Sequence, residues 1–246
     1  IAMSFFNDIS AIQNIIYIFS SILFISGIKM LGKEDTAVKG NFLSAMAMFI
    51  AVSVTIINVV NPIIVIIGIA IGALIGSLIA LKVKMTSIPE MVALFNGFGG
   101  LATFFIAWSE FNAIPDNVFQ YVLIMLTTYI GGVTFSGSII AYGKLSEKLK
   151  IQKDSIITKL FTTLFYLSIL FLVYSTTLTS FIELPIDFYK VLLILTLLGG
   201  IGFVLPIGGG DMPVVISLLN SFSGIAAAFA GLLLLNNVLI VAGSLV

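Results

Sequence analysis

A glycine-rich acidic stretch is the first place in this sequence that could do chemistry. Residues 208–221 read GGGDMPVVISLLNS, so Gly208, Gly209 and Gly210 lead into Asp211 and an apolar run. A phosphate-binding loop would need a lysine and a hydroxyl residue after its glycines, and a dinucleotide fingerprint would need a preceding strand and a downstream acid; neither pattern is present. Asp211 is instead expected to cap a helix, with a proline in the first turn. The glycines would let another backbone approach or let the segment move.

Two asparagines lie inside long apolar runs. Asn96 shares a helical face with Gly100 and Thr103, and Asn220 shares one with Ser217 and Gly224. The two runs are expected to enter from the same side, so the two side chains could meet. A single asparagine in a membrane helix most often joins helices, at about 1 kcal/mol. Two on glycine-rich faces also fit a hydrated polar site, and both interpretations stay open.

A third polar feature is a stripe along one apolar run. It consists of residues three or four apart: Thr127, Gly131, Thr134, Ser138 and Tyr142. Such hydroxyls usually bond to their own backbone, yet a stripe of more than three turns could also line a hydrated path. Gly68, Gly72 and Gly76 form a separate small-residue ridge, which favours close helix packing.

The elements that carry these residues are membrane-spanning helices. Of 246 residues, 60% are hydrophobic and 9% charged, whereas a soluble domain has about 25% charged residues. Apolar runs near the ~20 residues needed to cross a bilayer recur along the chain. They predict an all-α polytopic helix bundle of about nine spans, the last one too short to cross and apparently cut: 10–31, 42–60, 62–81, 89–109, 117–142, 156–178, 188–206, 213–235 and 238–246.

The composition also excludes several function classes. The formal net charge is zero, which gives no basic surface for nucleic acid. There is no cysteine and no histidine, so disulfides, thiolate metal sites and imidazole chemistry are excluded within these residues. The first ten residues lack the basic segment of a cleavable signal peptide. We expect no catalytic, metal or cofactor-binding residue in this chain.

Lysine placement predicts the orientation of the spans. All eleven basic residues are lysines, and ten of them fall in or beside the odd-numbered connections. Basic residues favour the cytoplasmic side. The N-terminus is therefore expected outside the cell, and the odd connections and the C-terminal side in the cytoplasm.

Three blocks of the sequence resemble a known family. They are VKMTSIPEMVALFNGFGGLA (83–102), GGVTFSGSIIAYGKL (131–145) and GGGDMPVVISLLNSFSGIAAAFAGLLLLNNVLIVAGSLV (208–246). Their order and spacing are similar to those of the β subunit of proton-translocating NAD(P) transhydrogenase, and the resemblance extends over the whole chain.

The resemblance implies a single transmembrane domain over residues 1–246 that couples proton translocation to hydride transfer between NADH and NADP⁺. NADP(H) would bind a cytoplasmic domain following the last helix, absent from these residues. NAD(H) would bind a partner α subunit, which also supplies further membrane helices. The implied setting is the inner membrane, with the complex as a dimer in the lipid bilayer. No hydride chemistry would occur within this chain.

The same resemblance assigns roles to individual residues. Asp211, with Gly208, Gly209 and Gly210, resembles the segment that signals to the NADP(H) domain. Asn220 resembles a polar residue of the proton channel, and Asn96, Thr134 and Ser138 are expected to line the channel with it. Asn96 stands where many members have a histidine, and asparagine cannot titrate. We therefore expect a partner chain to supply the proton-carrying group, with Asn96 and Asn220 holding an ordered water near it.

Two other function classes remain as alternatives. A secondary transporter of a small solute or ion would fit the glycine-rich segments, but it predicts pseudo-symmetric halves with broken helices, which the sequence does not show. A structural membrane subunit would use the polar faces only to join helices.

Overall fold

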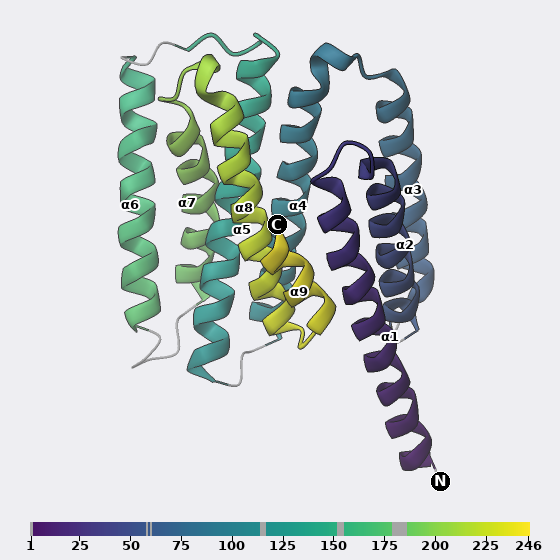
Figure 1. The fold of residues 1–246 in the computed structure, drawn as a ribbon. Helices are drawn as coiled ribbons and strands as arrows, with labels where there is room; N and C mark the ends of the chain where they lie inside the picture. The colour runs from purple at the N-terminus through teal and green to yellow at the C-terminus, as the bar shows by residue number, and fades with distance from the viewer. Residues whose placement is uncertain (1, 58, 60, 114–116, 152–154, 179–185) are drawn as a thin grey trace. The chain divides into compact units, whose positions relative to one another are not determined.

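The described part of the chain is helical throughout. A computed structural model describes residues 2–57, 59, 61–113, 117–151, 155–178 and 186–246. Its α-helices are shown in Figure 1, and their bounds are α1 Ala2–Leu31, α2 Ala37–Ile56, α3 Pro62–Lys82, α4 Ile88–Asn112, α5 Val118–Leu145, α6 Ile156–Leu178, α7 Ile186–Val204, α8 Met212–Leu233 and α9 Asn237–Leu245. Short 3₁₀ turns, η1 (Met85–Ser87) and η2 (Gly209–Asp211), precede α4 and α8. Among these residues eight helices are long and apolar enough to cross a membrane, which confirms the all-α polytopic prediction.

The chain divides into two units, the first ending at Val83 and the second running from Lys84 to Ser244. In the first unit α1 and α2 pack as a hairpin, where a Cβ added to Gly40 would lie 2.7 Å from the Gly27 carbonyl oxygen. The Tyr17 and Thr55 hydroxyls hydrogen-bond across the same pair at 2.9 Å. Among the described residues of this unit, no atom outside the neighbouring turns of α3 lies within 4 Å of where a Cβ on Gly68, Gly72 or Gly76 would be. The ridge on α3 therefore does not make the close packing expected of it inside this unit.

Helix α5 is the central helix of the second unit. It packs against α4, α6, α7 and α8, and about two thirds of the residues in its most apolar stretch are buried. Tyr189 of α7 is buried against it, with its ring stacked on Phe111 of α4 at 3.8 Å. The Tyr189 hydroxyl hydrogen-bonds the Thr128 hydroxyl of α5 at 2.8 Å. The polar stripe of α5 is thus carried by the most buried helix of the unit.

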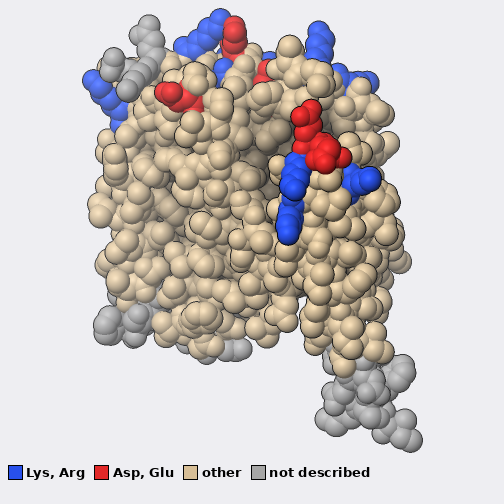
Figure 2. Space-filling view, viewed as in Figure 1, with Lys and Arg blue, Asp and Glu red and all other residues tan. Residues whose placement is uncertain are grey.

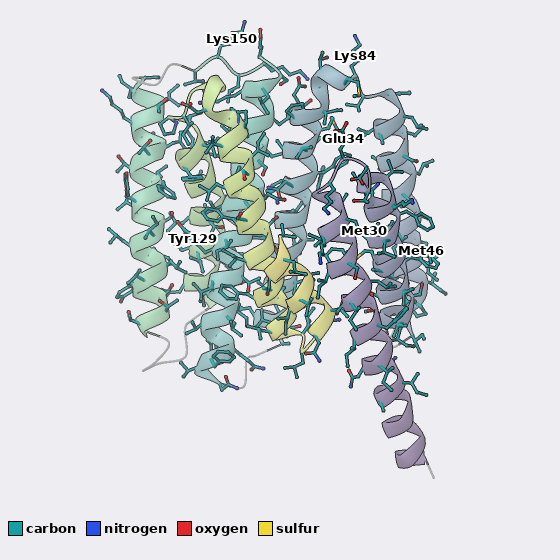
Figure 3. All side chains as sticks on the ribbon, in the orientation of Figure 1. Met30, Glu34, Met46, Lys84, Tyr129 and Lys150 are labelled. Atoms are coloured by element: carbon teal, nitrogen blue, oxygen red, sulfur yellow. The ribbon has the colours of Figure 1, made fainter. Side chains whose placement is uncertain are left out.

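The charged ends of these helices gather on one side. The start of α4, the end of α5 and the start of α8 lie at the same end of the second unit (Figure 1). Lys84 and Lys150 lie at this end in Figure 3, and Figure 2 shows basic and acidic side chains along it above an uncharged belt. We call it the lysine-rich end. It is the end that the lysine distribution assigns to the cytoplasm.

Candidate functional site

The side chain of Asn96 joins three helices. Its Nδ2 donates to Ser138 Oγ of α5 at 3.2 Å, and its Oδ1 accepts from Ser223 Oγ of α8 at 2.8 Å. Asn96 itself lies on α4 and is half-buried. We call Asn96, Ser138 and Ser223 the polar junction. Two residues expected to line a channel, Asn96 and Ser138, are therefore in direct contact.

Glycines permit this contact by removing side chains between α4 and α5. A Cβ on Gly97 would lie 3.0 Å from Ser138 Cβ, and one on Gly100 would lie 2.8 Å from the Gly131 carbonyl oxygen. These separations are at or below the closest approach of real Cβ atoms, so larger residues would separate the helices. The middle of the expected stripe, at Gly131, Thr134 and Ser138, thus packs tightly against α4, while the Ser138 hydroxyl remains available to Asn96.

Ser223 is the functional candidate that the sequence analysis missed. Its hydroxyl lies 2.8 Å from Asn96 Oδ1 and 2.7 Å from the Asn220 carbonyl oxygen in its own helix. A hydroxyl has one hydrogen, so it can donate to only one of these acceptors at a time. The signal that could have identified Ser223 is its position three residues after Asn220, on the same side of α8.

Asn220 contributes to the junction through its backbone only. Its side chain is exposed on the surface of α8, and the polar side chain that α8 gives to Asn96 is Ser223. The structure therefore does not bring the two asparagine side chains together. An exposed Asn220 amide in a membrane helix faces lipid or a further helix.

Thr134 lies one turn before Ser138 and is fully buried. Its Cβ lies close to Gly100, yet its Oγ1 has no hydrogen-bond partner among the described residues. An unpaired buried hydroxyl costs free energy unless a small polar molecule satisfies it. This unpaired hydroxyl lies one turn from Ser138 of the polar junction.

Asp211 occupies the N-cap position of α8 without capping it. Its carboxylate makes no cap hydrogen bond, and the residue is exposed at the end of η2. The capping role expected for Asp211 is therefore wrong: the 3₁₀ turn gives it helical backbone angles (φ −90°, ψ 0°), whereas a capping side chain needs an extended backbone. The acid is instead free to meet something outside the chain at the lysine-rich end.

The three glycines before Asp211 are equally open. In the described part of the chain, no atom beyond the adjacent residues lies within 4 Å of where a Cβ on Gly209 or Gly210 would be. A Cβ on Gly208 would have one such neighbour there, an Asp211 carboxylate oxygen at 3.9 Å. None of the described glycines has a positive φ. Neither packing nor backbone conformation within the chain requires these glycines, which leaves the close approach of another backbone or movement of the segment as their use.

Comparison with known proteins identifies the family. A model of the NAD(P) transhydrogenase beta subunit matches residues 13–246. The chain belongs to this family. Two curated relatives are 35% identical to it over 94% of its length. Both are called NAD(P) transhydrogenase subunit beta, and both come from Rhodospirillum rubrum, one of them from a named strain. The chain spans about half the length of these relatives, 51%.

The polar junction of this family member has no group that titrates near neutral pH. An amide and two hydroxyls can accept and donate hydrogen bonds and can hold a water, but none takes up a proton to become a stable cation. Among the described residues no cluster of three or more aspartate or glutamate side chains is arranged to hold a metal. The site therefore suits the relay of hydrogen bonds rather than the storage of a proton.

Proposed function

We propose that this chain is the membrane domain of a proton-translocating NAD(P) transhydrogenase and that its polar junction forms part of the proton channel. The observation that supports this most is the pair of hydrogen bonds by which Asn96 links α4, α5 and α8 beside the unpaired Thr134 hydroxyl. Asn96, Thr134 and Ser138 line the channel together with Ser223. Asn220 belongs to it through its carbonyl, which competes with Asn96 for the Ser223 hydrogen.

The nucleotides bind outside this domain. NADP(H) binds an attached domain and NAD(H) a domain of a partner α subunit, and hydride passes between them there. The complex is a dimer in the inner membrane, with the N-terminus of this chain outside and the lysine-rich end in the cytoplasm. The partner's membrane helices supply the group that takes up and releases the proton, next to Asn96.

Asp211 and Gly208–Gly210 couple the channel to the nucleotide domain. They are exposed at the lysine-rich end and lead directly into α8, which carries Ser223. A change in the NADP(H) state that shifts α8 would move the Ser223 hydrogen between its two acceptors and so open or close the path. Proton movement contributes about 2.3 kcal/mol per charge per 100 mV, enough to bias a nucleotide-binding equilibrium by tens-fold.

The test uses vesicles that hold the full-length β subunit with its α partner. NADPH oxidation by an NAD⁺ analogue is followed while a dye reports internal pH. We expect acidification that tracks turnover and collapses with an uncoupler. Turnover with no pH change would contradict the proton-channel function. Solute uptake without nucleotide turnover would favour a secondary transporter instead.

A further inference from the structure

Lys144 makes an unusual set of contacts at the lysine-rich end. It lies in the last turn of α5 and is half-buried. Its Nζ donates to the carbonyl oxygens of Leu205 and Ile207, each at 2.5 Å, and to that of Val204 at 3.4 Å. One ammonium group therefore faces three carbonyls of another segment.

Those carbonyls belong to the end of α7 and the loop that follows it. The last carbonyls of a helix have no partner within the helix, and this end carries the negative end of the helix dipole. Val204 and Leu205 are buried, so water competes poorly for their oxygens. The Val204 carbonyl also accepts from the Ile207 backbone N–H at 3.1 Å, so the lysine chiefly supplies donors to the Leu205 and Ile207 carbonyls. It also brings the compensating charge from a neighbouring helix.

The loop held in this way leads into the coupling segment. Ile207 is followed directly by Gly208–Gly210 and Asp211, and then by α8 with Ser223. On the other side, Lys144 lies six residues after Ser138 on α5, about 9 Å along a rigid helix. Lys144 thus connects α5, which carries Ser138, to the loop that leads into α8, which carries Ser223.

The loop also has space beside it. A cavity of about 170 Å³ is bounded by Lys144, Leu149 and Ile151 on one side and by the segment Leu205–Gly209 on the other. All three hydrogens of the lysine ammonium have carbonyl acceptors, and the cavity walls contain both polar and apolar atoms. Without the lysine contacts the loop could shift into this space.

We infer that Lys144 is a positioning residue that fastens the coupling segment to α5 and transmits its movement to the polar junction. This inference rests on the proposed function, because it assigns the junction to the proton channel. In this role Lys144 neither binds the nucleotide nor carries the translocated proton. It acts through its hydrogen bonds to the loop carbonyls. Removal of its charge should free the glycine segment and uncouple it from Ser138.

The test compares Lys144→Met, which keeps an unbranched chain of nearly the same length without the charge, with Lys144→Arg, which keeps the charge. Lys148→Met is the matched control, because Lys148 is exposed just beyond the end of α5 and contacts the Tyr142 hydroxyl rather than the loop. Each variant is made in the full complex. Proton translocation in vesicles and the amount of assembled complex are measured for each.

A second readout follows the loop itself. In separate samples, each variant also carries Gly209→Cys, at a position with open surroundings, and a nitroxide spin label is attached to this cysteine. The spectrum of the parent complex without Gly209→Cys, treated with the same label, is subtracted as the background. With K144M we expect a more mobile label and at least tenfold slower proton translocation, at unchanged assembly and NADPH affinity. K144R should recover most of both properties, and K148M should match the parent.

Two results would overturn the inference. An unchanged label spectrum in K144M would show that the lysine does not hold the loop. A mobile label with parental proton translocation would show that Lys144 does not transmit movement of the loop to the polar junction. The spin-label experiment does not depend on proton transport. A parent complex that fails to translocate protons would contradict the proposed function, and the label would still show whether Lys144 restrains the loop. If K144M does not accumulate, K144Q is read in the same way.

Discussion

Asn96 uses both ends of its amide within the bundle. The nitrogen reaches Ser138 and the oxygen reaches Ser223, so the residue is both a connection between helices and the centre of a possible hydrogen-bond path. Connection alone would be worth about 1 kcal/mol. A change at Thr134 can distinguish the two roles. Its hydroxyl has no hydrogen-bond partner among the described residues, so removal of the hydroxyl breaks no connection between helices.

Thr134→Val should therefore stabilise the domain and impair its transport. The valine keeps the shape against Gly100 and removes an unpaired buried hydroxyl, which should raise thermal stability by the equivalent of about 1 kcal/mol. Proton translocation should fall several-fold if that hydroxyl serves the channel. Thr127→Val is the control, since the Thr127 hydroxyl already donates to the Leu123 carbonyl at 2.7 Å. Parental transport in T134V would remove Thr134 from the channel.

The sequence predicted part of this site. Asn96 and Ser138 stand out because polar groups are costly in apolar runs. The choice between Asn220 and Ser223 could not be predicted, because both lie on nearly the same side of α8 and differ by about 60° around its axis. The rotation of α8 against α4 decides between them, and that rotation depends on packing between distant segments.

At the scale of elements, glycines determine how closely α4 and α5 approach. Gly100 and Gly131 bring the two backbones into contact, with Thr103 Oγ1 2.8 Å from where a Cβ on Gly131 would be. The approach places Asn96 within reach of Ser138. The polar junction therefore depends on residues that carry no polar side chain themselves.

Gly100→Ala and Gly99→Ala form a matched pair that tests this dependence. A Cβ at position 100 would lie 2.8 Å from the Gly131 carbonyl oxygen, whereas among the described residues no atom outside the neighbouring turns of α4 itself lies within 4 Å of a Cβ at position 99. We expect G100A to destabilise the domain by about 1–3 kcal/mol and G99A to change its stability little. Thermal unfolding in detergent measures both. Equal effects would contradict the tight α4–α5 contact.

Helix bounds were the part of the fold most accessible from sequence. The run predicted at 213–235 is α8 at Met212–Leu233, and that predicted at 62–81 is α3 at Pro62–Lys82. Long apolar runs ended by prolines, glycines and charges mark such bounds directly. The neighbours of each helix were not accessible, because nearly every face is apolar and periodicity alone cannot distinguish lipid from protein.

At the scale of the whole molecule, the lysines and the bundle give consistent pictures. Lys84, Lys150 and the start of α8 lie at one end of the second unit (Figures 1 and 3). The end of α4 and the start of α5 lie at the opposite end (Figure 1). Positive residues favour the cytoplasm, so the lysine-rich end is predicted to face the cytoplasm and the proposed nucleotide domains.

Single cysteines test the predicted orientation, because these 246 residues contain none. Lys84→Cys, Lys150→Cys and Gly209→Cys should react with an impermeant thiol reagent in inverted vesicles and not in intact cells. Asn117→Cys should show the reverse pattern. The parent complex gives the background from cysteines elsewhere. Labelling of Lys84→Cys and Gly209→Cys from opposite sides would contradict the topology of the second unit.

The most direct test of the central claim is proton translocation by Asn96→Leu in the full complex. Leucine keeps the branched skeleton of asparagine and removes both hydrogen bonds of the polar junction, and Asn237→Leu, at the exposed start of α9, is the control. NADPH-driven acidification of vesicles is measured against the amount of assembled complex. The account predicts at least a tenfold loss in N96L with normal assembly and parental activity in N237L. Parental acidification in N96L would show that the junction only joins helices.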